Sequence, residues 1–190
     1  SPLIICFFST MEFNYLITER LKLRIITPTV LQYVYHNYTD EQLIIFLGLP
    51  NAEQLAIEKS KFEKGYTTYK IDYLGFQLLD KTNLNVIGWC GFHSWYPEHQ
   101  RAEIGYHIIE ETNKGKGYMS EAFGAIINYG FQHMQLNRIE ALIGPQNIAS
   151  QQLVHKFGFV KEGVMRQHYF KNGQLEDSII YALLKADYLK

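Results

Sequence analysis

The sequence predicts an α/β domain in which a mixed sheet carries helices on both faces. Stretches in which apolar and polar residues alternate are typical of strands, and they recur in both halves of the chain. One long stretch has apolar residues at helical spacing and lies between two of these strands. The expected order is strand, helices, three strands, helix, strand, helix and hairpin, which suits a sheet covered on both sides.

The N-terminal half is expected to contribute strands and a set of helices. The alternating stretch RLKLRII (20–26) predicts a strand, and Thr27-Pro28 after it is typical of a helix start because proline suits the first helical turn. The other expected elements are helices over about 29–38, 40–47 and 52–64, strands over 73–80 and 85–93 joined by a polar turn at 81–83, and a loop over 93–100.

The C-terminal half begins with the strand RAEIGYHII (101–109) and continues into the long helix. The apolar stripe of that helix, which would pack on the sheet, consists of Met119, Ala122, Phe123, Ile126, Ile127, Gly130 and Met134. Asn147 is a suitable cap for the next helix, and Asn172-Gly173 is a strong hairpin signal. The remaining elements are a strand over 138–144, a short helix from 147 to 156, and strands over about 160–170 and 175–185.

Length and composition exclude several classes of protein. The chain has 190 residues, and its hydrophobic residues, 47% of the total, are spread along the whole length, which fits one domain over 11–190 with a sizeable core. The formal net charge of −1 gives no general attraction to nucleic acid or to an anionic membrane. Cys6 and Cys90 lie far apart and make neither a disulfide framework nor a metal quartet, so a cytoplasmic location is expected.

The N-terminus carries the longest apolar run, PLIICFF. This run is far too short to span a bilayer core of roughly 30 Å, and it lacks the basic region of a signal peptide. Because Met11 precedes the first regular pattern, residues 1–10 are expected to be an extended start or residues foreign to the domain.

Two glycines at the mouth of the long helix are the first functional signal. Gly115 and Gly117 weaken a helix, yet they allow a ligand to approach the unpaired N–H groups of its first turn. A helix N-terminus attracts anions, and Lys114 and Lys116 add positive charge, so the turn is typical of a phosphate or pyrophosphate site. From these residues alone, a solvated loop with incidental glycines stays open.

The common nucleotide motifs do not fit this turn. A Walker loop needs G-x-x-x-x-G-K-[ST], and the chain has no such run. A dinucleotide fingerprint needs a third glycine and a place after the first strand, whereas Gly117 is followed by Tyr-Met-Ser in mid-chain.

Several motifs taken in order resemble the GNAT superfamily of acetyltransferases. They are ITERLKLRIITP, AEIGYHI, GKGYMSEA, NRIEA, PQNIASQQLVHKFGFVKEGVMR and KNGQLEDSIIYALL, and they cover roughly residues 15–186. The similar branch acetylates the N-termini of ribosomal proteins. The resemblance implies a mostly antiparallel central sheet of about seven strands, acetyl-CoA as cosubstrate without a metal, and a primary amine as acceptor.

The resemblance also implies a set of cofactor-binding residues. The superfamily signature [QR]-x-x-G-x-[GA] falls on TNKGKG, where Thr112 replaces the usual Gln or Arg, while backbone donors need no particular side chain. In the family pattern, Asn147 contacts the pantetheine, and Lys156 is within reach of a CoA phosphate unless it is simply solvated. The backbone contacts come from Ile108 and Ile109 for the pantetheine, and from Lys114, Gly115, Lys116, Gly117, Tyr118 and Met119 for the pyrophosphate.

Glu103 is the candidate general base. On an alternating strand it shares a face with Gly105 and His107, and that face would look into a cleft. The alternatives are that a water relay acts as the base, or that Glu103 pairs with a neighbouring cation or has a structural role. By resemblance Ser150 lies near the sulfur as the acid, because Val154 occupies the place where many members of the family carry a tyrosine.

Aromatic residues and histidines complete the candidates. Trp95 and Tyr96 are expected to wall the acceptor pocket, with surface packing as the alternative. The histidines His93, His99 and His107 lack the spacing of a metal motif. Cys90 is expected to be an inert core thiol, and Asp177 to have a structural role.

The acceptor and the oligomeric state remain open at this point. The leading interpretation is transfer to a protein α-amine, and the alternatives are a small amine such as a polyamine or an amine antibiotic, or a CoA-binding sensor without turnover. The expected partner is therefore an amine substrate, with neither nucleic acid nor membrane, and a homodimer is left open.

Overall fold

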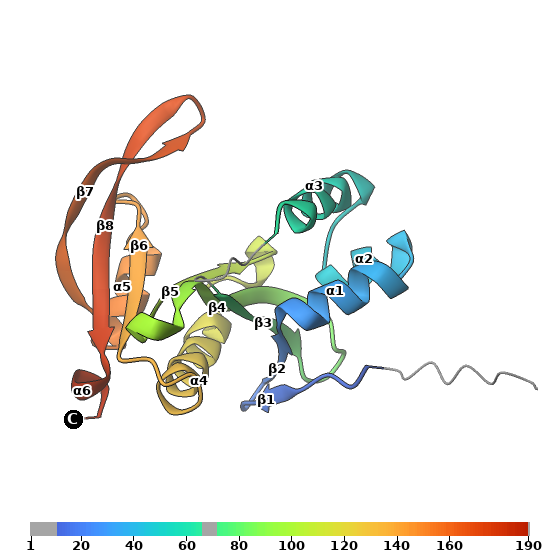
Figure 1. The fold of residues 1–190 in the computed structure, drawn as a ribbon, viewed down its shortest axis with the longest axis horizontal. Coiled ribbons are helices and arrows are strands. Elements are labelled where there is room, and N and C mark those ends of the chain that lie inside the picture. The colour runs from blue at the N-terminus through green and yellow to red at the C-terminus, as the bar shows by residue number, and fades with distance from the viewer. Residues whose placement is uncertain (1–10, 66–71, 190) are drawn as a thin grey trace, which may run out of the picture.

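One mixed sheet organises the chain in this computed structural model, which describes residues 11–65 and 72–189. Within those residues the strand order is β1-β2-β3-β4-β5-β6-β8-β7, and every neighbouring pair is antiparallel except β5 and β6 (Figure 1). The strands are β1 (Tyr15–Ile17), β2 (Leu21–Ile26), β3 (Asp72–Asp80), β4 (Val86–Tyr96), β5 (Arg101–Ile108), β6 (Arg138–Ile143), β7 (Val160–Lys171) and β8 (Gln174–Leu184). The expected fold class is confirmed, with β1 as one strand more than the sequence predicted; the expectation for residues 1–10 lies outside the described residues.

The helices begin and end where their capping residues indicate. Thr27, Thr39 and Asn51 accept backbone hydrogen bonds at the starts of the first three helices, and Gly48 ends the second with a φ of 69°. The predicted bounds are correct to within one or two residues for these elements. The helices are α1 (Pro28–Asn37), α2 (Asp40–Leu47), α3 (Ala52–Lys64), α4 (Tyr118–Gln132), α5 (Ile148–Lys156) and the short α6 (Lys185–Tyr188), which the sequence did not predict.

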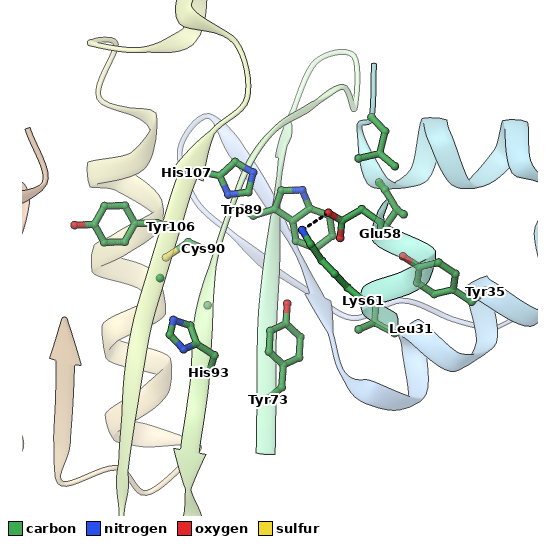
Figure 2. Close-up of a pocket in the computed structure, with 14 residues that line it drawn as sticks. Leu31, Tyr35, Glu58, Lys61, Tyr73, Trp89, Cys90, His93, Tyr106 and His107 are labelled. Atoms are coloured by element: carbon green, nitrogen blue, oxygen red, sulfur yellow. Dashed lines mark hydrogen bonds and ion pairs between the residues drawn. The ribbon is translucent and has the colours of Figure 1, made fainter. Parts of the chain in front are cut away.

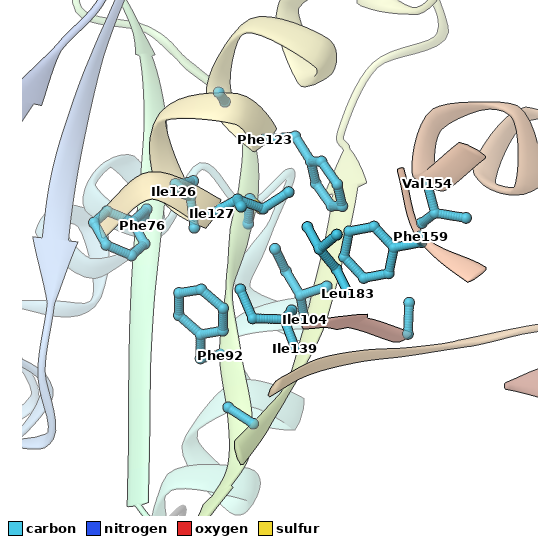
Figure 3. Packing of buried hydrophobic residues seen from close by; sticks show 14 of the residues in the cluster. Phe76, Phe92, Ile104, Phe123, Ile126, Ile127, Ile139, Val154, Phe159 and Leu183 are labelled. Atoms are coloured by element: carbon cyan, nitrogen blue, oxygen red, sulfur yellow. The ribbon is translucent and has the colours of Figure 1, made fainter. Parts of the chain in front are cut away.

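Helices cover the two faces of the sheet and bury two separate clusters. On one face α4 packs against the sheet, where Phe123, Ile126 and Phe92 are fully buried (Figure 3). On the other face α1, α2 and α3 enclose a smaller cluster that includes Val34 and Leu43 (Figure 1). The larger cluster thus holds α4 in a fixed place next to β5.

The alternation of β5 decides which of its residues are available for chemistry. Ala102 and Ile104 are buried in the cluster under α4. Glu103, Gly105 and His107 therefore face the opposite side, toward the helices α1 to α3, as the sequence predicted.

The region between β4 and β5 differs from the prediction. β4 continues to Tyr96, and a 3-10 turn over Pro97–His99 follows, where the sequence suggested a loop from 93 to 100. A register shift between His93 and Tyr96, with Ser94 at a φ of 46°, lets the strand carry on past its regular pairing. Local patterns do not encode such a bulge, so the sequence placed the end of this strand too early.

Removing the Phe123 side chain should destabilise the fold strongly. Phe123→Ala takes a fully buried ring from the contact between α4 and the sheet, and we expect a loss of about 3–5 kcal/mol in the free energy of unfolding. The measurement is urea unfolding followed by circular dichroism. Ile45→Ala is the control, because Ile45 on α2 is 77% exposed; similar losses for both variants would contradict this account of the core.

Candidate active site

The sheet opens between its two parallel strands. β5 and β6 pair over three residues only, from Arg101 with Arg138 to Glu103 with Glu140. Beyond this point β5 stays paired with β4 up to Ile108, and β6 stays paired with β8 up to Ile143. The two strands therefore diverge, and the edge of β5 that faces β6 is left without a neighbouring strand.

The free edge of β5 directs backbone groups into this opening. Ile109 donates its N–H to Ile87 of β4 at 2.9 Å, and Gln100 accepts from Arg138 of β6 at 3.1 Å. Because successive residues of a strand point their backbone groups to opposite sides, Tyr106 and Ile108 direct theirs into the opening. Ile109, expected beside Ile108 at this site, instead uses its N–H within the sheet.

The glycine turn presents amide groups next to the opening. Gly115 and Gly117 have φ values of 72° and 80°, which glycine adopts readily. Gly117 precedes α4 without a side-chain cap, and the N–H of Glu121 is the first to bond back, to the Gly117 carbonyl at 3.0 Å. The N–H groups of the preceding helical residues, 118 to 120, thus have no partner within the helix, which is the arrangement that attracts anions at helix N-termini.

An ion pair braces the back of this turn. Arg20 donates to the carbonyl of Lys116 at 2.9 Å and to the carboxylate of Glu121 at 2.8 Å, and its guanidinium lies 4.6 Å from the centre of the Tyr118 ring. The Lys116 carbonyl is therefore held by Arg20, the residue directly before β2. Burial opposes ionisation of Glu121, but hydrogen bonds from Thr18 and Arg20 outweigh it and hold the pKa of Glu121 below its ordinary value.

A cleft joins the turn to the helix α5, and we call it the turn cleft. It has a volume of about 540 Å³, and its walls include Gly115, Gly117, Tyr106, Asn147 and Ser150. Lys114, Tyr118, Met119 and Ile108 also line it, whereas Lys116 and Ile109 of the same expected set do not.

One of the expected lysines, Lys114, lines the turn cleft, and another, Lys156, lies just outside it. Lys114 pairs with Glu111, and Lys156 donates to the hydroxyl of Ser120 at 2.6 Å. Since Ser120 lines the cleft, Lys156 lies one side chain away from it.

A second, smaller cleft lies in the opening itself, and we call it the strand cleft. It measures about 250 Å³ and brings together Glu103, His93, Asn147 and Ser150, together with Tyr169 from β7. Asn147 accepts the N–H of Ser150 at 3.1 Å, so it caps α5 through its amide oxygen. The two predicted catalytic residues, Glu103 and Ser150, thus line the same space from different elements.

Glu103 is buried beside a second carboxylate. Its side chain is 15% exposed, and its partner across the parallel pair is Glu140. Burial and the charge of Glu140 raise the pKa of Glu103 to about 7. Arg101 and Arg138 bind Glu140, at 3.2 and 2.6 Å, instead of neutralising Glu103.

A third space, the aromatic cavity, lies on the far side of β5 (Figure 2). Tyr35, Tyr73 and Trp89 line it, its volume is about 310 Å³, and Glu58 and Lys61 form an ion pair of α3 at its wall. The aromatic cavity meets the strand cleft at His93, Gly105 and Tyr106, which line both.

The two aromatic residues that the sequence placed at the acceptor pocket have packing contacts instead. Trp95 packs against the large core cluster, and Tyr96 stacks on Arg101 at 4.2 Å. Neither lines the turn cleft, the strand cleft or the aromatic cavity. The prediction depended on a loop, whereas both residues lie on the extended end of β4.

Sequence reasoning missed Tyr169 and undervalued His93. Tyr169 reaches the strand cleft because β7 bulges near Gln167, whose N–H donates to Asp177 at 2.8 Å; this bond gives Asp177 a structural role. Burial and the charge of Glu103 raise the pKa of Tyr169. His93 lies across from Glu103, with Nδ1 3.7 Å from Oε2. Only long-range pairing makes either residue part of the site.

The described residues contain neither a metal-binding cluster nor a helix that could span a membrane. No group of three or more His, Cys, Asp or Glu side chains there could hold a metal ion. No helix within 11–65 and 72–189 is long and apolar enough to cross a membrane. Cys90 is buried, and burial raises the pKa of its thiol.

Comparison with known proteins points to one family. The family description "Acetyltransferase (GNAT) domain" matches residues 20–160. The chain is 33% identical to the N-acetyltransferase YoaA of Bacillus subtilis over 174 residues, which cover 91% of this chain and 98% of the relative. It is also 33% identical to the ribosomal-protein-serine acetyltransferase of Escherichia coli over 97 residues, which cover 51% and 54%.

Solved structures agree with this result at the level of the fold. The spermidine N-acetyltransferase of Vibrio cholerae, in complex with CoA and spermine, has a TM-score of 0.63 and 22% identity, covering 90% of this chain and 99% of that one. At such identity the likeness shows the fold alone.

The Glu103–Glu140 pair gives a direct test of the site's electrostatics. Glu140→Gln removes a like charge, so the ionised form of Glu103 becomes easier to form and its pKa should fall from about 7 toward its ordinary value. The measurement is a pH titration of carboxyl-labelled glutamate by ¹³C NMR. Glu162→Gln is the control, because Glu162 binds Arg138 but is not paired with Glu103; an equal fall in both variants would show that Glu140 has no specific effect.

Proposed function

The chain belongs to the GNAT acetyltransferase family and is an N-acetyltransferase; from this premise, we propose that it moves the acetyl group of acetyl-CoA directly to the N-terminal α-amine of a protein. The observation that supports this most is the opening between β5 and β6. There the turn cleft, the strand cleft and the aromatic cavity all include Tyr106. A thioester and an amine that enter from opposite sides of β5 would meet at this residue.

The turn cleft has the donors that a CoA diphosphate requires. The N–H groups from Lys114 to Met119 would bind the diphosphate, with Gly115 and Gly117 allowing its close approach. The backbone of Tyr106 and Ile108 would pair with the pantetheine amides, and Asn147 would contact the same arm. Lys156, held near Ser120, would add a cation for a CoA phosphate.

Glu103 and Ser150 would divide the proton transfers between them. Acetyl transfer needs a neutral amine and a proton for the leaving thiolate. With a pKa of about 7, Glu103 is matched to a general base that works near neutral pH. Ser150 lines the strand cleft next to the pantetheine path and would protonate the thiolate.

The aromatic cavity favours an α-amine over a polycation. Its carboxylate, Glu58, is already paired with Lys61 at 2.6 Å, and most of its other walls are apolar or aromatic. An α-amine with a pKa near 8 also deprotonates at pH 7 for only about 1 kcal/mol, whereas a lysine-like amine near 10.4 costs about 4–5 kcal/mol. Ribosomal proteins, on which the Escherichia coli relative acts, are therefore the first acceptors to test, and they would place the reaction in the cytoplasm.

A side chain at Gly117 should block binding of acetyl-CoA. Gly117→Val adds a branched side chain whose Cβ would lie 3.4 Å from Nη2 of Arg20, and the resulting displacement of the turn should raise the dissociation constant by about tenfold or more, measured by isothermal titration calorimetry. Gly173→Val is the matched control: Gly173 has a φ of 78°, close to that of Gly117, but it lies in the β7–β8 turn. Equal affinities for the two variants would place the diphosphate elsewhere.

An acceptor panel tests the reaction itself. Thiol release from acetyl-CoA should be faster with peptides that carry a free α-amine than with spermidine or lysine, and mass spectrometry should place the acetyl group on the N-terminus. Glu103→Gln should lower kcat by about 10²–10⁴-fold while acetyl-CoA still binds. Faster turnover of spermidine would support a polyamine acceptor, and binding without release for any amine would support a sensor.

A further inference from the structure

We infer that the acceptor amine does not give its proton to Glu103 directly but passes it through His93, so that the two side chains act as a relay across the β4–β5 pair. The inference rests on the proposed function, because Glu103 remains the final base. His93 is not a residue that sequence spacing singled out for catalysis. The geometry of three neighbouring positions supports this role.

The first observation is the pairing of the two side chains. His93 and Glu103 are direct cross-strand partners, and they project from the same face of the sheet. The imidazole Nδ1 lies 3.7 Å from the Glu103 carboxylate, a distance that a small movement converts into a hydrogen bond. The histidine side chain is 44% exposed, whereas that of Glu103 is 15% exposed. The imidazole is thus the accessible end of the pair.

The second observation is where the two residues lie relative to the cavities. Glu103 lines the strand cleft but not the aromatic cavity. His93 lines both of them, and its ring lies between the two strands at the edge of the aromatic cavity in Figure 2. An amine held in the aromatic cavity therefore meets the imidazole before it can reach the carboxylate.

The third observation is the missing side chain at Gly105. A Cβ at this position would lie 2.9 Å from Nε2 of His93, closer than real Cβ contacts, and 3.1 Å from its Cδ2, which is tighter than most of them. Glycine weakens a strand, so its presence in the middle of β5 indicates a close approach. Here the approaching group is the imidazole, which lies over Gly105 with Nδ1 toward Glu103 and Nε2 on the opposite side of the ring.

The electrostatic surroundings suit a shared proton. Burial lowers the pKa of His93, and burial together with the charge of Glu140 raises the pKa of Glu103 to about 7, so the proton of an imidazolium passes to the carboxylate in the favourable direction. The other titratable or charged groups around the pair are Glu140 of β6, which Arg101 and Arg138 bind, Tyr169 of β7, Tyr106 and His107 of β5, and Glu58 with Lys61 of α3.

The relay accounts for every proton of the reaction. The acceptor enters as an ammonium; one proton moves to Nε2 of His93, and the proton on Nδ1 moves to Glu103 and then to solvent. The neutral nitrogen attacks the acetyl carbonyl carbon, the C–N bond forms and the C–S bond breaks. Ser150 gives its hydroxyl proton to the thiolate and regains a proton from the nitrogen, which thereby loses its second proton. The products are the amide, the free thiol and one proton.

Kinetics on two variants test the role of the imidazole. His93→Gln should lower kcat by about 10²–10⁴-fold and remove the limb of the pH–rate profile that reports titration of the enzyme's base. The dissociation constant of acetyl-CoA should change by less than about twofold. Gly105→Ala keeps both groups but displaces the ring, and it should lower kcat by about tenfold or more. His99→Gln, on the 3-10 turn after β4, is the matched control and should keep the parent rate.

A titration that needs no acceptor separates this inference from the proposed function. Imidazole ¹⁵N NMR of the parent should show a second titration step for His93 near pH 7, where Glu103 ionises, and that step should be absent in Glu103→Gln. The relay is wrong if His93 titrates alike in both proteins, or if His93→Gln turns over at the parent rate. If no amine is acetylated by the parent enzyme, the proposed function fails while the NMR result still decides whether the pair exchanges a proton.

Discussion

The short parallel pairing between β5 and β6 is the constraint on which the rest of the structure depends. Antiparallel strands on both sides hold β5 and β6 in place, so the gap between them cannot close by pairing. N–H and C=O groups on the edge of β5, which would pair with another strand in a continuous sheet, are available here to a ligand that carries amide groups. The glycine turn, the Asn147 cap of α5 and the Glu103 carboxylate all border this gap. The turn leads into α4, Asn147 begins α5, and Glu103 lies where the pairing of β5 with β6 ends.

Local physics made most of the fold predictable from the sequence. Caps at Thr27, Thr39 and Asn51 and the apolar stripe of α4 set helix positions, since each acts within one or two helical turns. The sequence also located Gly115 and Gly117 at the turn before this helix, where both have the positive φ values that glycine adopts readily. The resemblance to a family supplied what local patterns lack, namely the common location of these residues with Asn147 and Ser150.

The rest of the site depends on contacts between distant parts of the chain. Arg20 and Glu121 are separated by 101 positions, and no pattern in the sequence links them. His93 lies at the site because it pairs with Glu103 of β5. Tyr169 lies there because β7 bulges, and the Asp177 side chain of β8 binds the backbone of that bulge. Trp95 and Tyr96 were misplaced because the same kind of irregularity extends β4. Sequence reasoning failed where strand register and bulges decide which way a side chain points.

The bond from Arg20 to the Lys116 carbonyl has a consequence for the dynamics of the empty enzyme. That bond fastens the beginning of the sheet to the back of the turn, while a bound anion would hold the front. Occupation of the front would therefore slow local opening of β1 and β2 as well, although neither strand lines the turn cleft. In hydrogen exchange, the N-terminal hairpin would then be a remote reporter of cosubstrate occupancy.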